Sequence, residues 1–185
     1  SRCAGVPCHI APRPRVLAAE RLLRALGEGH VALFLPRPVF PTKCQYLSLH
    51  PAPFAATRKY PPDYLPALGR ELGAAEGLIG NLRAVYIGGG TPFAPEAGEL
   101  AQVLRAVAPL RTNGCEYTVE AGRPDTFTRE KLEVCREFGV TRICINAQSF
   151  SDETLARIGR KHTAQAVRDA FAPPAPYDFL INCDL

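Results

Sequence analysis

Apolar residues recur along the chain in two alternating patterns. Continuous apolar runs with the length of buried strands lie at 31–35, 84–87, 117–120, 142–146 and 179–183. Between these runs, apolar residues recur every three or four positions, which predicts helices near 63–79, 96–107, 129–138, 152–158 and 164–171. A further short helix is predicted over 16–26. Strands and helices therefore alternate through most of the chain.

This alternation predicts an α/β fold. Strands that are apolar on both faces and joined through helices pack into a parallel sheet with right-handed crossovers, either a doubly wound sheet or a (β/α) barrel. The chain ends at 184–185, directly after the fifth run, so that strand would lack cover and a neighbour on one edge. We expect a partial (β/α) barrel of about five parallel strands over 31–185, the N-terminal part of a larger barrel. An irregular lead-in over 1–30 with one short helix precedes it.

Composition excludes several classes of protein. Hydrophobic residues make up 46% and charged residues 22% of the chain, as in ordinary globular proteins. The net charge is +4, and basic residues alternate with acidic ones, so no stripe suited to nucleic acid is present. No signal peptide and no apolar run of 18 residues occur, so we expect a cytoplasmic protein without a membrane span. There the 7 cysteines would be metal ligands, catalytic thiols or small buried side chains.

The second predicted strand is followed by three glycines and a threonine, at 88–91. In barrels, functional residues gather at the carboxyl ends of strands. Glycines there let the backbone approach a ligand and present N–H groups to an anion, although a tight strand-to-helix turn is an equally good interpretation. The segment is not a P-loop or a dinucleotide fingerprint, because it lacks the Gly-Lys-Ser/Thr sequence of the first and the glycine spacing of the second.

Polar residues also follow the other predicted strands. Glu120 closes the third strand, where it could accept hydrogen bonds from ribose hydroxyls or form an ion pair with Arg123. Gln148 follows the fourth strand, and an amide buried there would need polar partners. Arg160 lies further along the same loop, where a solvated cation is the plainer interpretation, and Asp184 follows the fifth strand. Together these residues ring one end of the predicted barrel.

Four segments, taken in order, resemble the radical S-adenosylmethionine (SAM) superfamily. Its closest branch is oxygen-independent coproporphyrinogen III dehydrogenase and its relatives, and the Glu-Ala-Gly-Arg-Pro-Asp-Thr run is most similar to the HemZ subgroup. The resemblance covers about residues 31–185 and implies a partial (β/α) barrel with its cofactor at the C-terminal mouth. The segments are YIGGGTP (86–92), EYTVEAGRPDTFTREKL (116–132), INAQSFSDETLARIGRKHT (145–163) and INCDL (181–185).

The resemblance also implies a cofactor site and a reaction. Gly89, Gly90 and Thr91 would line the methionyl end of SAM, and Glu120 would take its ribose hydroxyls. Gln148, Arg160 and Asp184 would complete the site. A four-iron four-sulfur cluster would bind SAM and cleave it to a 5′-deoxyadenosyl radical, which converts propionate side chains to vinyl groups. The implied partners are coproporphyrinogen III or a related tetrapyrrole and an electron donor. The implied SAM residues are Gly89, Gly90, Thr91, Glu120, Gln148, Arg160 and Asp184.

The loop that holds the cluster in this family departs from the family pattern. The family uses Cys-x-x-x-Cys-x-x-Cys after the first strand, and Cys44 keeps one of these positions, but Phe40 and Leu47 occupy the other two. Because iron–sulfur clusters need thiolates as their principal ligands, one cysteine cannot replace three. The sequence predicts a radical SAM oxidoreductase of this branch with impaired cluster chemistry; the alternatives are a non-catalytic SAM- or tetrapyrrole-binding protein and an inactive remnant. Cys3, Cys8 and His50 could replace the missing cluster ligands only at spacings that differ from the family motif.

Overall fold

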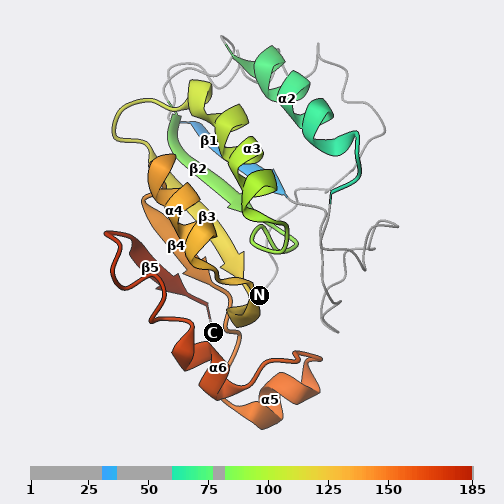
Figure 1. Cartoon of the computed structure of the whole chain (residues 1–185), viewed down its shortest axis with the longest axis vertical. Helices are drawn as coiled ribbons and strands as arrows, with labels where there is room; N and C mark the ends of the chain where they lie inside the picture. Colours follow the sequence, from blue (N-terminus) through green and yellow to red (C-terminus); the bar gives the residue numbers. More distant parts are fainter. Residues whose placement is uncertain (1–30, 37–59, 77–81, 185) are drawn as a thin grey trace.

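A computed structural model describes residues 31–36, 60–76 and 82–184 (Figure 1). Five parallel strands form one sheet in the order β1-β2-β3-β4-β5, so each strand pairs with the one before it (Figure 1). A strand order that never reverses is typical of a barrel wall, whereas a doubly wound sheet contains a reversal point. The predicted partial barrel is therefore confirmed. The strands are β1 (Val31–Pro36), β2 (Leu82–Gly88), β3 (Glu116–Gly122), β4 (Arg142–Ile145) and β5 (Leu180–Cys183).

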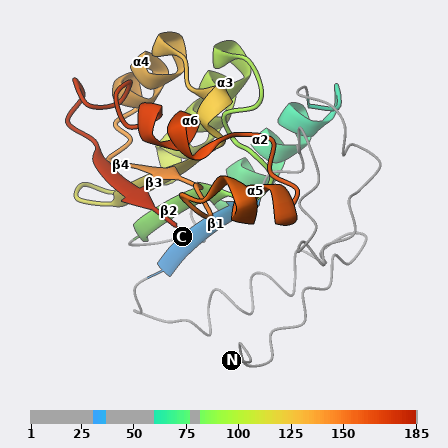
Figure 2. The same cartoon turned by 90° about the horizontal axis from the view of Figure 1, so that it is seen from below.

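Helices connect the strands, as parallel crossovers require. Three of them, α2, α3 and α4, lie on one side of the sheet, while α5 and α6 lie beyond the carboxyl ends of the strands (Figures 1 and 2). No helix in the described part of the chain is long and apolar enough to cross a bilayer. The helices are α2 (Tyr64–Ala75), α3 (Ala97–Val107), α4 (Arg129–Glu137), α5 (Asp152–Arg157) and α6 (Ala164–Asp169), with 3₁₀ turns η1 (Ala108–Leu110) and η2 (Pro124–Thr126).

Local signals account for the ends of these helices. The Thr128 hydroxyl accepts the N–H of Lys131 at 3.3 Å and so begins α4. Gly139, which has a φ of 68°, follows the helix, because glycine adopts this conformation without a Cβ penalty. α2 ends at Ala75, earlier than the expected end near 79, because Glu76 leaves the helical conformation with a ψ of 127°. The helix over 16–26 and the lead-in over 1–30 lie outside the described residues.

The two faces of the sheet differ, so the premise that the strands are apolar on both faces was wrong. The helix-facing side chains are apolar and at most 1% exposed, and they pack against leucines of α3 and α4. Side chains alternate along a strand, so the residues between them point to the opposite, inner face, and most of these are polar. The helix-facing set is Val85, Ile87, Tyr117, Val119, Ile143 and Ile145. The inner-face set includes Tyr86, Thr118, Glu120, Cys144 and Asn182.

Candidate functional site

The predicted SAM residues lie at the carboxyl edge of the sheet. Three follow β2, Glu120 lies near the end of β3, Gln148 follows β4 and Asp184 follows β5. Arg160 lies between α5 and α6, where its backbone N–H donates to the Leu155 carbonyl at 2.8 Å and closes the end of α5. The structure brings four of these residues into two hydrogen-bonded groups: Gly89 with Glu120, and Gln148 with Asp184.

Glu120 is the centre of the first group. One carboxylate oxygen accepts the hydroxyl of Tyr86 at 2.8 Å, and the other accepts the backbone N–H of Gly89 at 3.1 Å. Burial raises the pKa of Glu120, the two hydrogen bonds oppose this rise, and the charge of Asp184 adds to it. Burial and the neighbouring carboxylate likewise raise the pKa of Tyr86 far above its ordinary value, so this hydroxyl stays protonated and donates.

The glycine turn brings its backbone against this carboxylate. Gly89 and Gly90 have φ values of 67° and 48°, a left-handed conformation that favours glycine. At Gly88, a Cβ would lie 2.6 Å from the Tyr86 ring and 3.1 Å from the Glu120 carboxyl carbon. Close approach of backbone to side chain is thus the reason for glycine at this position. The structure thus shows the tight turn, and approach to a ligand stays a prediction.

Thr91, the last residue of the turn, is buried against β3. Its methyl carbon lies 2.6 Å from the place where a Cβ on Gly122 would stand, and Gly122 has a φ of 79°. The Thr91 carbonyl accepts the N–H of Ala94 at 2.9 Å. Thr91 therefore holds the turn against the strand that carries Glu120, and a role toward SAM stays a prediction.

Asp184 is the centre of the second group. One of its oxygens accepts the side-chain amides of Gln148 at 2.7 Å and Asn146 at 3.0 Å. The Gln148 backbone N–H also donates to the Asp184 carbonyl at 3.0 Å. Gln148 has a φ of 67°, and such strained residues persist where the surrounding contacts fix them, as Asp184 does here.

Two buried acceptors in this group lack donors. The Oδ1 atoms of Asn146 and Asp184 are buried and accept no hydrogen bond from the described residues. Since buried polar atoms are almost always hydrogen-bonded, a ligand that carries donors would fit here. The ribose hydroxyls and amino groups of SAM are such donors, so SAM fits the acceptors that Glu120, Asn146 and Asp184 provide.

The residues at the three cluster-ligand positions do not fit a four-iron four-sulfur cluster. Cys44, Phe40 and Leu47 lie outside the described residues, and their chemistry offers one thiolate where three are needed. Among the described residues, no group of three His, Cys, Asp or Glu side chains could hold a metal ion. Burial raises the pKa of Cys135 to about 12 and also raises the pKa of Cys144, so these thiols are protonated and act as small apolar side chains, as expected.

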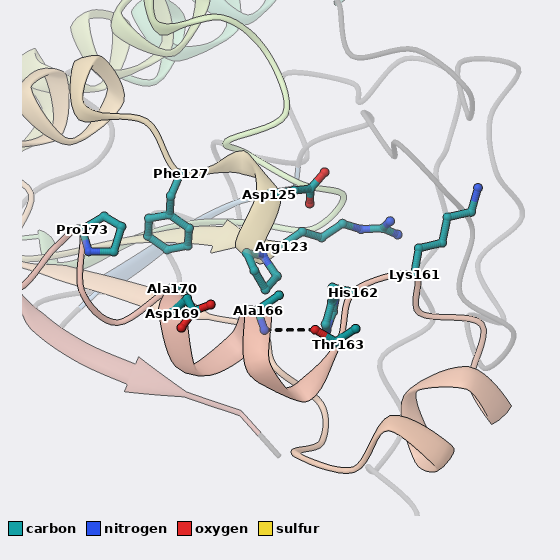
Figure 3. A pocket seen from close by; sticks show the side chains of 11 residues that line it. Arg123, Asp125, Phe127, Lys161, His162, Thr163, Ala166, Asp169, Ala170 and Pro173 are labelled. Carbon is teal, nitrogen blue, oxygen red and sulfur yellow. Dashed lines mark hydrogen bonds between the residues drawn. The ribbon is translucent and has the colours of Figure 1, made fainter.

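A cavity of about 680 Å³ lies beside this site, between the loop that follows β3 and helix α6 (Figure 3). Arg123, Lys161 and His162 lie at one end together with the acidic Asp125, while Phe127 and Pro173 lie toward the other (Figure 3). The remaining lining residues are Pro124, Asp125, Thr163, Ala166, Asp169 and Ala170.

His162 connects this cavity to the Asp184 group. Its Nε2 lies 3.4 Å from the carbonyl of Ala147, the residue before Gln148. Burial lowers the pKa of His162, so the ring is neutral at pH 7.

Sequence reasoning missed three contributors to these sites. Tyr86 was read only as part of a strand, and Asn146 only as a strand end, because nothing local marks their partners 34 and 38 residues away. Arg123 was considered only as an ion partner of Glu120, so the cavity that it lines was missed. The alternation of side chains along β2 is the signal that could have placed Tyr86 on the same face as Glu120.

Comparison with known proteins shows the family of the chain. The model of the radical SAM superfamily matches residues 44–172. The oxygen-independent coproporphyrinogen-III oxidase-like protein HemZ of Bacillus subtilis is 34% identical over 159 residues, 82% of this chain and 31% of that protein. The heme chaperone HemW of the same organism is 33% identical over 114 residues, 59% of this chain and 30% of that protein.

A solved structure gives the same fold. Coproporphyrinogen III oxidase HemN from Escherichia coli, a radical SAM enzyme, superposes with a TM-score of 0.74 at 19% identity, over 89% of this chain and 39% of that one. The chain thus spans between 30% and 39% of the length of these three relatives. The superfamily uses SAM together with a four-iron four-sulfur cluster, and its match extends across most of the described sheet. The chain belongs to the radical SAM superfamily.

Proposed function

We propose that this chain binds SAM at the carboxyl edge of its sheet and does so without an iron–sulfur cluster. The observation that carries this proposal is the Glu120 carboxylate, held by Tyr86 and Gly89 at the glycine turn. The absence of cysteine at positions 40 and 47 supports the second half of the proposal.

The chain's own residues would divide the binding of SAM between the two groups. Glu120 would accept hydrogen bonds from the ribose hydroxyls, and the backbone of Gly89 and Gly90 would approach the methionyl end. The acceptors of Asn146 and Asp184 would take further donors, and Arg160 would complete the site. Bound SAM supplies a sulfonium centre with a cleavable carbon–sulfur bond.

Calorimetric titration with SAM tests this proposal. We expect saturable binding, weakened at least about tenfold in Glu120→Ala because a charged acceptor is lost. Glu133→Ala is the matched control, since Glu133 also accepts a tyrosine hydroxyl, at 2.9 Å from Tyr177, but lies on α4 away from the strand ends. No heat with SAM, or equal losses in both variants, would refute the proposal.

A second candidate is the oxidative decarboxylation of porphyrinogen propionates, with an external electron donor. It is favoured by 34% identity to the HemZ protein, whose name describes it as coproporphyrinogen-III oxidase-like. This function requires a cluster. Anaerobic reconstitution with iron and sulfide would then give about four irons per chain and broad visible absorbance. A colourless, iron-free product would exclude it.

A tetrapyrrole is the ligand that we propose for the cavity between η2 and α6. Its volume of about 680 Å³ suits a cofactor-sized molecule, and Arg123 and Lys161 would face propionate groups while Phe127 and Pro173 contact the ring system. The HemW relative, named a heme chaperone, supports this choice.

Haem titration followed by absorbance would test this cavity. Arg123→Ala should weaken binding about tenfold, because the side chain is 6% exposed and lines the cavity. Arg129→Ala serves as the control, since that side chain is 85% exposed on α4. If Arg123→Ala and Arg129→Ala bound haem with the same affinity, haem would bind at another surface.

A further inference from the structure

We propose that Tyr86 is a positioning residue, whose hydroxyl fixes the Glu120 carboxylate in the orientation that a ribose diol requires. This inference rests on the proposed binding of SAM. It adds a residue that the resemblance to the superfamily did not assign.

The hydrogen bonds to Glu120 are arranged symmetrically. Tyr86 donates to Oε1 at 2.8 Å and Gly89 donates to Oε2 at 3.1 Å. An ionised carboxylate offers about two acceptor positions on each oxygen, so one position on each remains. Two neighbouring hydroxyls of a ribose can occupy two such positions at once. If the carboxylate rotated freely, its two acceptor positions would face the two ribose hydroxyls for only a small part of the time.

Gly88 makes this arrangement sterically possible. A Cβ at this position would stand 2.6 Å from Cε1 of Tyr86 and 3.1 Å from Cδ of Glu120, and the first distance is well inside van der Waals contact. Gly88 is the last residue of β2, so the Tyr86 ring packs along the strand end toward Glu120 on β3. Any larger residue would displace the ring or the carboxylate.

The surroundings of Glu120 make the hydrogen bond from the Tyr86 hydroxyl important. The titratable groups that face it from neighbouring elements are Tyr86 on β2, Cys144 on β4 and Asp184 after β5. Burial and the charge of Asp184 both disfavour the ionised carboxylate, while the Tyr86 hydroxyl favours it. Removing the hydroxyl should therefore both loosen the carboxylate and promote its protonation.

The first test uses the ligand-free chain and does not depend on SAM. The carboxyl carbon resonance of Glu120, assigned with Glu120→Gln, is followed against pH by NMR in the wild type and in Tyr86→Phe. We expect the titration midpoint to move upward in the variant, because a donor to the charged form is gone. An unchanged midpoint would overturn the positioning role, whatever SAM does.

The second test measures SAM affinity at pH 7.5. Tyr86→Phe should weaken binding about tenfold, the effect of one lost hydrogen bond to a charged group, and Gly88→Ala should weaken it by a similar factor. Tyr177→Phe is the matched control, since it removes a tyrosine–glutamate hydrogen bond of 2.9 Å on α4 and should leave SAM affinity unchanged.

The two tests separate the two proposals. Absence of SAM binding in the wild type refutes the proposed function, whereas the NMR midpoint still decides the role of Tyr86. Wild-type SAM affinity in Tyr86→Phe, with binding lost in Glu120→Ala, overturns the positioning role and leaves the proposed function in place. Thermal unfolding of each variant checks that Tyr86→Phe and Gly88→Ala remain folded.

Discussion

At the scale of single residues, the site depends on two carboxylates that lie close together at the strand ends. Glu120 and Asp184 are both partly buried, and the charge of Asp184 raises the pKa of Glu120. Each accepts hydrogen bonds from the described residues: from a hydroxyl and a backbone N–H in the case of Glu120, and from two side-chain amides in the case of Asp184. The inner face thus gathers hydrogen-bond acceptors at the strand ends, and a ligand with hydroxyl and amino donors would complement them.

The affinity for SAM should depend on pH through Glu120. Its pKa is raised above 4.5, chiefly by burial, so the protein binds the proton at a higher pH than a free glutamate does. Only the ionised carboxylate can accept two ribose hydroxyls in addition to its protein donors. We expect SAM affinity to be constant at neutral pH and to fall as the pH is lowered toward the raised pKa.

Calorimetric titrations from pH 8 down to the lowest pH at which the chain stays folded measure this effect. Asp184→Asn is informative here, because removing the neighbouring charge should move the loss of affinity to lower pH. A flat profile in the wild type over this range would show that protonation of Glu120 does not control binding.

At the scale of elements, the site depends on how two loops are held together. The Lys131 side chain, 7% exposed on α4, donates to the Phe93 carbonyl at 2.6 Å and to the Thr126 carbonyl at 3.2 Å. Phe93 belongs to the segment after the glycine turn, and Thr126 to η2 after Glu120. A single buried cation therefore joins the loops that follow β2 and β3.

Replacing Lys131 by methionine should destabilise the chain. The variant keeps the apolar stem but leaves two buried carbonyls without this donor, which costs about 2–4 kcal/mol. Arg129→Met, at a site that is 85% exposed, is the control and should change stability little. Urea unfolding followed by circular dichroism measures both; equal midpoints for wild type and Lys131→Met would contradict this role.

The elements were more predictable from the sequence than the site was. Helix ends depend on neighbours in the chain, so the helix predicted over 129–138 nearly matches α4, which lies between Thr128 and Gly139. The hydrogen bonds of Tyr86 with Glu120 and of Asn146 with Asp184 depend instead on the register of parallel strands, which local pattern does not encode. The polar inner face was missed for the same reason: single polar residues within apolar runs gave no sign of sharing one surface.

For the molecule as a whole, the described sheet has one face covered by helices and one face without helical cover (Figure 2). β5 pairs with β4 on one side, and no described strand pairs with its other edge. Leu180, at the start of β5, is 59% exposed, while the neighbouring Ile181 packs against the core. An exposed strand edge with an apolar side chain is a template for pairing with another chain.

We therefore expect the 185-residue chain to self-associate through β5. Leu180→Lys should reduce this association, because a lysine on an edge strand places charge where a second strand would pair. Sedimentation velocity over a range of concentrations measures the effect, and Arg129→Lys, which keeps the charge of an exposed helix position, is the control. A wild-type chain that stays monomeric at the highest concentration would contradict the expectation, since it would mean that the β5 edge is protected. Association that persists unchanged in Leu180→Lys would instead place the contact on another surface.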